Sequence, residues 1–350
     1  MSSFAFSEAV RIGHIGVGRW GSNLLRNTVA IPGAEVVAVC DPRDPALAAA
    51  SRLAPSARAV RDPDVLLADD GVEAVVIATE TPLHYRHALA ALQAGKHVFV
   101  EKPLAQTAAE AERLVEEARA RDLRLMVGHL LRYHPAFRHV EGLVEGGALG
   151  DVRYVYSVRV NLGVVRDREN AFDSLAPHDL AVARALIPGR AVAVAAQGQA
   201  FLQEGIEDVV FATVTYEGGQ IAHLHCSWLD PHKVRRTTVV GSDQMAVVDD
   251  MEPAEKVRVY DKGIDPSAET GYASFAGALT VRSGDITVPR VAPAEPLRLE
   301  CEEFVAAIRE GRPARTDGED GLAVVRILEA ARRSLAEGGA RVEVGKGEGE

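Results

Sequence analysis

Three glycines, Gly16, Gly18 and Gly21, follow a short apolar run and precede a helix-like segment over residues 23–30. In a strand, turn and helix with this spacing, the first glycine forms the tight turn and the second lets the backbone approach a pyrophosphate. The third lets the helix pack close to the strand, and the helix N-terminus favours an anion. The pattern therefore predicts a dinucleotide site. A turn that serves only helix–strand packing is the alternative.

An acidic residue, Asp41, ends the next apolar run, at the distance from the glycines that is typical of dinucleotide-binding folds. A carboxylate in this place can bind the 2′-hydroxyl of an adenosine ribose, and it repels the 2′-phosphate of NADP. We therefore expect NAD as the cofactor. Arg43, two residues later, leaves NADP open as an alternative.

The elements that must position these residues alternate along the first part of the chain. Strands are expected at 35–41, 72–79, 96–100 and 123–127, and helices at 45–53, 62–68, 82–94 and 107–121. This alternation indicates βαβ units and a parallel, doubly wound sheet, in which ligands bind beyond the carboxyl ends of the strands. Residues 79–84, 101–103 and 128–133 follow predicted strands, so we expect them near a bound ligand.

The second part of the chain is dominated by period-two alternation and hairpin turns, which indicate half-buried strands. Strands are expected at 152–160, 208–216, 220–227, 235–240, 245–249 and 256–260. The helices expected between and after them are 135–145, 178–186, 297–310 and 319–336.

Four segments resemble one known family, and the similarity extends over about residues 10–344. They are the glycine turn with Thr81-Pro-Leu-His84, the segment 95–103 (Gly-Lys-His-Val-Phe-Val-Glu-Lys-Pro), 128–135 and 176–179. They are similar to the glucose–fructose oxidoreductase, inositol dehydrogenase and rhizopine catabolism (Gfo/Idh/MocA) family.

The resemblance implies an α/β fold with two domains. An N-terminal Rossmann NAD(P)-binding domain would cover residues 9–128. A C-terminal α+β domain with an open, mostly antiparallel sheet would cover 129–344, bind the substrate and mediate oligomerisation. Cofactor and substrate domains would meet across a cleft, and residues 345–350 would form a disordered tail.

The resemblance also implies that Lys102 is catalytic and contacts both the nicotinamide ribose and the substrate hydroxyl. A cation there would stabilise the alkoxide that develops as the hydride leaves. Glu101 would line the nicotinamide end or hold Lys102, and a plain ion pair is equally open. His84 either has a structural role at a helix start or lines the cofactor cleft. The residues expected at the cofactor are Gly16, Gly18, Arg19, Trp20, Gly21, Asp41, Arg43, Thr79, Pro82, His84, Glu101 and Lys102.

His178 is the residue that we expect to act as general acid and base. An imidazole, with an unperturbed pKa of about 6.5, can take the hydroxyl proton while hydride moves to nicotinamide. Many family members carry Asp four residues earlier, where this chain has Ser174, preceded by Asp173. Asp173 would then replace the family acid in a shifted position, or Ser174 would bind a substrate hydroxyl. Asp179 would orient His178 or cap a helix.

The substrate class follows from three further segments. Residues 159–163, 175–180 and 227–233 are similar to family members that oxidise a nucleotide-linked amino sugar at carbon 3. Arginine is suited to bidentate recognition of a carboxylate or diphosphate. The residues expected at the substrate are Arg132, Tyr133, Asn161, Arg166, His178 and Lys233. His223 and His225 share a strand face, but no third ligand accompanies them at a suitable spacing, so we expect no metal site.

Composition restricts the classes of partner. The chain has 350 residues, a net charge of −11 and three widely separated cysteines. The acidic balance argues against nucleic-acid binding. Scattered cysteines argue against a disulfide framework and for a reducing cytoplasm. We expect neither a signal peptide nor a membrane span, and an open sheet face would favour a homodimer or homotetramer.

We therefore expect a cytoplasmic NAD(P)-dependent oxidoreductase that transfers hydride between nicotinamide and a secondary hydroxyl or ketone of a small-molecule sugar. A dehydrogenase for a free sugar or inositol is one alternative. Another is an NAD-dependent glycosidase, which would release free sugar without net NADH. A third is a non-catalytic NAD-binding sensor of the same fold.

Overall fold

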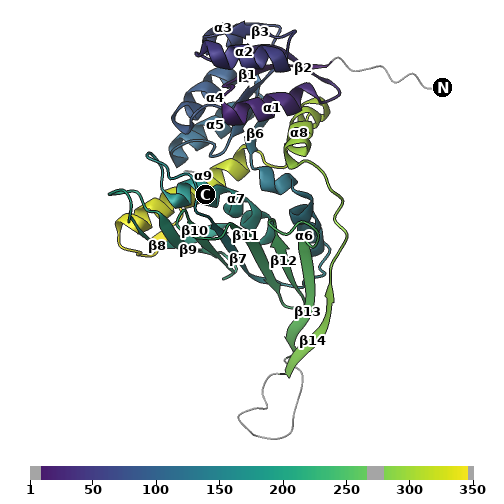
Figure 1. Cartoon of the computed structure of the whole chain (residues 1–350), viewed down its shortest axis with the longest axis vertical. Helices are drawn as coiled ribbons and strands as arrows, with labels where there is room; N and C mark the ends of the chain where they lie inside the picture. Colours follow the sequence, from purple (N-terminus) through teal and green to yellow (C-terminus); the bar gives the residue numbers. More distant parts are fainter. Residues whose placement is uncertain (1–8, 266–279, 346–350) are drawn as a thin grey trace, which may run out of the picture. The chain divides into compact units, whose positions relative to one another are not determined.

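The computed structural model describes residues 9–265 and 280–345. The chain divides into two units, and the first combines the residues up to Tyr133 with Ala294–Arg326 (Figure 1). The second combines His134–Pro293 with the residues from Ile327 onward. Each unit therefore contains chain from both halves of the sequence.

The domain limits expected from the sequence, 9–128 and 129–344, remain a prediction. Most of the expected tail, 345–350, lies outside the described residues. Among the helices in the described ranges, none is both long and apolar enough to cross a lipid bilayer.

Buried apolar runs of the first unit pair as parallel strands. In the described residues they form a six-stranded sheet with the order β3-β2-β1-β4-β5-β6. The strands are β1 Val10–Ile15, β2 Ala34–Cys40, β3 Arg58–Val60, β4 Ala74–Ile77, β5 His97–Glu101 and β6 Leu125–Gly128. This order is that of a doubly wound Rossmann sheet, so the predicted fold of this unit is confirmed.

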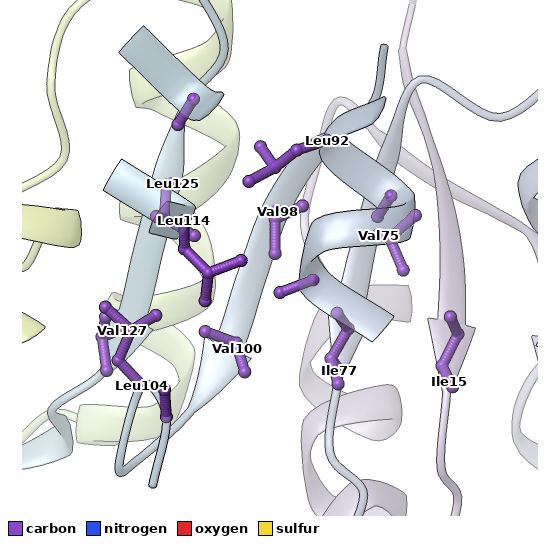
Figure 2. Close-up of a cluster of buried hydrophobic side chains, with 14 of the residues drawn as sticks. Ile15, Val75, Ile77, Leu92, Val98, Val100, Leu104, Leu114, Leu125 and Val127 are labelled. Carbon is purple, nitrogen blue, oxygen red and sulfur yellow. The ribbon is translucent and has the colours of Figure 1, made fainter. Parts of the chain in front are cut away.

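Helices cover both faces of this sheet because successive strand residues point to opposite sides. Figure 2 shows one layer, in which Val98 and Val100 of β5 lie among side chains of neighbouring strands and of the helices, including Leu92 and Leu114. On the opposite face, Phe99 meets Phe304 edge-on at 5.8 Å between ring centroids. The helices are α1 Arg19–Val29, α2 Asp44–Leu53, α3 Pro63–Leu67, η1 Thr81–Leu83, α4 His84–Gln93, α5 Ala108–Ala120, η2 Leu130–Tyr133, α8 Pro296–Glu310 and the start of α9 Gly318–Ala336.

Helix starts are encoded locally where a side chain can cap them. At α5, Thr107 Oγ1 accepts from the Glu110 N–H at 3.2 Å, and the Glu110 carboxylate accepts from the Thr107 N–H at 3.3 Å. This reciprocal capping box satisfies two N–H groups that the helix itself leaves unpaired. The predicted helix over 107–121 is therefore confirmed with bounds that differ by one residue at each end.

The described part of the second unit forms a nine-stranded sheet with the order β14-β13-β12-β11-β7-β10-β9-β8-β15. The β7–β10 pair is parallel and the other pairs are antiparallel, so the expected mostly antiparallel sheet is confirmed. The strands are β7 Val152–Val160, β8 Ala191–Gln199, β9 Val209–Tyr216, β10 Ile221–Ser227, β11 Val234–Gly241, β12 Met245–Asp249, β13 Val257–Asp265, β14 Thr280–Thr287 and β15 Val342–Glu343. The helices of this unit are α6 Pro135–Glu145, α7 Ala171–Leu186 and the end of α9.

One face of this sheet packs against α7, which contacts β7, β9 and β10. The opposite side chains remain exposed and include several large apolar residues. His225 stacks on Phe211 at 4.3 Å between ring centroids, and His223 stacks on Tyr156 at 5.8 Å. Both histidines are thus sheet residues, as predicted. The described residues contain no cluster of three or more His, Cys, Asp or Glu arranged to hold a metal ion.

One expectation about an element was wrong, and four strands were missed. Helix α7 begins at Ala171 and not at His178, because Asn170 caps it by accepting from the Asp173 N–H at 2.9 Å, and Pro177 lies inside it. The strands β3, β8, β14 and β15 were not predicted. In β8, alanine, glycine and glutamine have weak strand propensity, and pairing with β9 on one side and β15 on the other stabilises the strand instead.

Candidate cofactor and catalytic site

The glycine turn between β1 and α1 has no room for a side chain at Gly16 or Gly21. Gly16 has a φ of +89°, and a Cβ there would lie 2.7 Å from the Ala78 carbonyl oxygen. A Cβ on Gly21 would collide with the Gly16 carbonyl oxygen. Helix α1 starts after Gly18 without a side-chain cap, so its first N–H groups face outward for an anion. The turn therefore fits a dinucleotide pyrophosphate.

Asp41 at the end of β2 lies beside this turn and is held by several donors. Its Oδ2 accepts from the Val17 N–H at 3.1 Å and from Arg43 Nη2 at 3.0 Å. Its Oδ1 accepts from Arg43 Nε at 2.9 Å. Burial alone would raise the pKa of Asp41, but these hydrogen bonds outweigh it and lower the pKa. Asp41 is therefore an oriented carboxylate, and Arg43 is directly involved in holding it.

His84 joins two loops at the carboxyl ends of β4 and β5. Its Nδ1 lies 2.8 Å from the Pro103 carbonyl oxygen and its Nε2 lies 3.1 Å from the Thr79 carbonyl oxygen. Burial lowers the pKa of His84, and a neutral imidazole donates to one of the two carbonyls. The Lys102–Pro103 peptide is cis. His84 thus contributes structure to the loops that carry Thr79 and Lys102.

Glu101 connects the glycine turn to the end of β5. Its Oε1 accepts from Trp20 Nε1 at 2.5 Å, and its Oε2 accepts from the Lys102 N–H at 3.2 Å. A Cβ on Gly128 would lie 3.0 Å from the Glu101 carboxyl group, so glycine leaves the space that this carboxyl occupies. Burial raises the pKa of Glu101 to about 7, although the Trp20 hydrogen bond and the charge of Lys102 act in the opposite direction.

Arg132 and Tyr133, expected at the substrate, both lie mostly buried in the first unit. Arg132 Nη1 is 3.7 Å from Asp320 Oδ2. The Tyr133 hydroxyl lies 2.9 Å from Thr316 Oγ1, and its ring belongs to the apolar layer under α8. A substrate role for these two residues remains a prediction.

Helix α7 carries His178 and Ser174 one turn apart, so their side chains share a face of the helix. Asp173 does not share this arrangement. Its carboxylate pairs with Arg332 Nε at 3.1 Å, and burial raises its pKa in spite of that pairing. The structure therefore gives Asp173 a partner on α9, and its expected role as the family acid remains a prediction.

Asp179 does not cap α7, because the helix begins at Ala171 and Asn170 is its N-cap, so that expectation was wrong. Its other expected role, orienting His178, remains a prediction. Asp179 lies in the interior of the helix and accepts from Arg159 Nε at 2.5 Å and Nη2 at 2.9 Å. Ser157 Oγ also donates to it, at 2.8 Å. This network attaches α7 to β7 beside His178. The sequence contained one signal for it, an arginine within an otherwise apolar end of a strand.

The remaining expected substrate residues lie on loops and strand ends of the second unit. Asn161 Oδ1 accepts from Arg235 Nη2 at 2.5 Å. Arg166 is exposed near Glu169, with 3.5 Å between Nε and Oε1, and Lys233 is exposed. Arg235, itself a candidate for the substrate pocket from the sequence, thus holds Asn161 in place.

Comparison with known proteins covers both units. The family described as "Oxidoreductase family, NAD-binding Rossmann fold" matches residues 10–129, and the GFO/IDH/MocA C-terminal domain matches residues 137–247. The chain is 31% identical to UDP-N-acetylglucosamine 3-dehydrogenase of Acidithiobacillus ferrooxidans, over 92% of this chain and 95% of the relative. It is 30% identical to inositol 2-dehydrogenase of Acidothermus cellulolyticus, over 95% and 94% of the two chains.

A solved structure agrees with these matches. UDP-N-acetylglucosamine 3-dehydrogenase GnnA from Acidithiobacillus ferrooxidans superposes with a TM-score of 0.78 at 29% identity, covering 95% of this chain and 99% of that one. The similarity thus extends through both units and includes the glycine turn. The chain belongs to the GFO/IDH/MocA family and is an oxidoreductase with an NAD-binding Rossmann fold.

Proposed function

We propose that this enzyme is an NAD-dependent dehydrogenase that oxidises the carbon-3 hydroxyl of a nucleotide-linked amino sugar, or reduces the corresponding ketone. The observation that carries the proposal is the similarity, over nearly the whole chain, to UDP-N-acetylglucosamine 3-dehydrogenase. The segments 159–163, 175–180 and 227–233 of the second unit support the same substrate class.

NAD is the proposed cofactor because Asp41 is an oriented carboxylate at the end of β2. A negative charge there favours a ribose hydroxyl over a 2′-phosphate. Arg43 is bound to Asp41 through two side-chain hydrogen bonds, so its charge is already compensated. We therefore expect a lower Kd for NAD than for NADP. NADP use would require Arg43 to leave Asp41 and bind the phosphate.

The bound nicotinamide supplies hydride acceptance and donation. The chain's own residues would control charge and proton at the substrate. Lys102, at the end of β5, would stabilise the oxyanion that develops on the substrate oxygen. His178, on α7, would take the hydroxyl proton in the oxidation direction and return it in the reduction direction. Ser174, on the same helix face as His178, would bind a neighbouring substrate hydroxyl.

A second candidate function is inositol oxidation, which is supported by the 30% identity to inositol 2-dehydrogenase over nearly the full length of both chains. Both substrates present a secondary ring hydroxyl, so the same two side chains would serve either reaction. They differ in the nucleoside diphosphate, whose negative charge requires cationic groups. Lys233 and Arg166 are exposed cations of the second unit that are proposed to bind it.

The substrate experiment compares initial rates of NADH formation. Purified enzyme with NAD receives UDP-N-acetylglucosamine, UDP-glucose, free N-acetylglucosamine, myo-inositol or scyllo-inositol. We expect kcat/KM for UDP-N-acetylglucosamine to exceed each of the others at least tenfold. A preference for an inositol would select the second candidate. Sugar release without net NADH would favour a glycosidase, and NAD binding without any turnover would favour a sensor.

Oligomerisation is proposed to use the exposed face of the second sheet. Tyr154, Tyr156, Phe211 and Ile221 on that face are each more than a third exposed. An apolar patch of this kind is typical of an interface between subunits. Sedimentation analysis should therefore give a dimer or tetramer, and Phe211→Glu should shift the protein toward monomer. A cytoplasmic location is proposed because Cys40, Cys226 and Cys301 are all buried and unpaired.

A further inference from the structure

Glu300 is a buried carboxyl group on α8 that the proposed reaction does not use. Its side chain is 0% exposed, and within the described residues neither of its oxygens has a hydrogen-bond partner. An ionised carboxylate in such a place would lose its hydration without compensation. Burial, and then the negative charge of Glu101, raise the pKa of Glu300 well above its ordinary value. The site thus favours the protonated, neutral form of Glu300.

Packing between β5 and α8 brings Glu101 and Glu300 near enough for their charges to interact. Phe99 of β5 meets Phe304 of α8 edge-on, with 5.8 Å between ring centroids. Glu101 lies two residues after Phe99 on the same strand face, and Glu300 lies one helical turn before Phe304. Glu101 is thus close to Phe99, and Glu300 is close to Phe304, its edge-on partner.

The surroundings of the two acids are unequal. Glu101 accepts from Trp20 Nε1 at 2.5 Å and from the Lys102 N–H at 3.2 Å, and the Lys102 side-chain charge also acts on it. Glu300 accepts no hydrogen bond from the described residues. Two neighbouring buried carboxyls do not both ionise near neutral pH, and the negative charge belongs to the one with donors. That acid is Glu101.

Two further titratable groups, Tyr133 and Cys301, interact electrostatically with Glu300. Burial raises the pKa of Tyr133 on η2 and of Cys301 on α8, so both stay neutral. Lys102 is then the cation that acts on Glu101, and the pair responds to pH mainly through Glu101 itself.

We propose that Glu101 and Glu300 act as one proton-binding pair, in which Glu300 retains its proton and the ionisation of Glu101 connects the glycine turn to the end of β5 through Trp20. Glu300 is a positioning residue: its neutral carboxyl leaves the negative charge on Glu101, where Trp20 and Lys102 use it. Protonation of Glu101 below neutral pH weakens the hydrogen bond from the Trp20 N–H, because a neutral carboxyl is a weaker acceptor than a carboxylate. The consequence for cofactor affinity rests on the proposed function, whereas the proton binding itself does not.

Trp20 reports the state of Glu101 directly. The chain has two tryptophans, and Trp228 is buried at 2% exposure, so Trp228→Phe leaves Trp20 as the reporter. Fluorescence of the unliganded Trp228→Phe protein should titrate with a midpoint near pH 7, because burial raises the pKa of Glu101 to about 7. The transition should vanish with Glu101→Gln and persist with Glu300→Gln, because glutamine is neutral like the protonated acid. A midpoint near 4.3, the ordinary value for glutamate, would overturn the proposal.

The pH dependence of stability tests the protonation of Glu300. Its direction is opposite to that for an acid whose pKa is lowered on folding. A carboxyl whose pKa is raised on folding stabilises the protein fully below the unfolded pKa, and this contribution is lost as pH rises toward the folded pKa. Glu300→Gln has no carboxyl group to ionise, so its stability does not decrease with pH in this way. The unfolding constant of the wild type should therefore increase up to about tenfold per pH unit relative to Glu300→Gln as pH rises above about 4.3, the ordinary pKa of glutamate.

Two further variants make this measurement specific. In a protein that already carries Glu101→Gln, the pKa of Glu300 should be lower. The stability gained by adding Glu300→Gln should then stop increasing at a lower pH than in the wild type. Glu303→Gln, on the same helix, is the matched control: Glu303 pairs with Arg312 at 2.7 Å, so its loss should destabilise the protein. If the difference in stability between Glu300→Gln and the wild type does not change with pH, the proposal that Glu300 is protonated is wrong.

Cofactor affinity separates this inference from the proposed function. The Kd for NAD should rise as pH falls from 8 to 6 in the wild type, and it should be nearly constant over that range in Glu101→Gln. A Kd that varies equally with pH in both proteins would overturn the link to the glycine turn. If NAD binds to neither protein at any pH, the proposed function fails, while the fluorescence and stability measurements still decide whether the pair exists.

Discussion

Arg159 and Asp179 form a buried, bidentate ion pair that attaches α7 to β7. Arg159 Nε and Nη2 lie 2.5 and 2.9 Å from the two carboxylate oxygens, and the two residues are 8% and 3% exposed. Ser157 and Arg159 come from alternate positions of one strand and meet the same carboxylate. Because His178 directly precedes Asp179, the pair fixes the turn of α7 that carries the proposed general base.

Removing Asp179 should destabilise the protein strongly. We expect Asp179→Ala to lower the free energy of unfolding by about 3–5 kcal/mol, because the Arg159 guanidinium would remain buried without its counter-charge. Urea unfolding followed by circular dichroism measures this. The control is Glu217→Ala, which removes the partner of Arg190 in an ion pair that is nearly half exposed and should cost at most about 1 kcal/mol. Equal losses in the two variants would contradict the prediction.

Adding a methyl group at Gly16 should damage cofactor binding. Gly16→Ala places a Cβ 2.7 Å from the Ala78 carbonyl oxygen in a backbone conformation that disfavours side chains, so the turn must distort. We expect the Kd for NAD, measured by calorimetry, to rise at least tenfold, or by about 1.4 kcal/mol. Gly142→Ala is the control, because its Cβ meets no atom within 4 Å in helix α6. That variant should bind NAD normally and be slightly more stable.

Acid should abolish the contribution of Asp41 to stability. The folded-state pKa of Asp41 is lowered, so its stabilising effect is present above the unfolded pKa of about 3.9 and is lost as pH falls through the folded value. Asp41→Asn should therefore lower Tm at pH 6 and make progressively less difference as pH falls below about 4. Arg43→Gln should weaken this pH dependence, because it removes two donors to the carboxylate. A Tm difference that is the same at every pH would be inconsistent with this account.

Removing His178 should affect catalysis and leave cofactor binding intact. We expect His178→Ala to lower kcat by ~10²–10⁴, the range for loss of a general acid–base group, while the Kd for NAD changes little. Ser174→Ala should mainly raise KM if Ser174 binds a substrate hydroxyl. His232→Ala, at an exposed position outside the helix, serves as the control. Loss of NAD binding or of folding in His178→Ala would assign this histidine a structural role.

Features that depend on near neighbours in the chain could be predicted from the sequence. The glycine turn, the acid at the end of β2 and the strand–helix alternation of the first unit are such features, because spacing and apolar periodicity act over a few residues. The structure has each of them, with element bounds that shift by one to a few residues. The parallel sheet follows because continuous apolar runs need burial on both faces.

Partners that lie far away in the sequence were decided only by the tertiary structure. Asp179 looked like a helix cap or a partner of His178, yet it binds Arg159 on a strand. Asp173 pairs with Arg332, which is 159 positions away, and Glu300 lies in the unit that also contains Glu101. Composition and periodicity indicate which residues are buried. They do not indicate which charged side chains contact one another in the folded protein. For a carboxyl group, the neighbours that it has in the folded protein decide its charge, because hydrogen-bond donors and solvent access set its pKa.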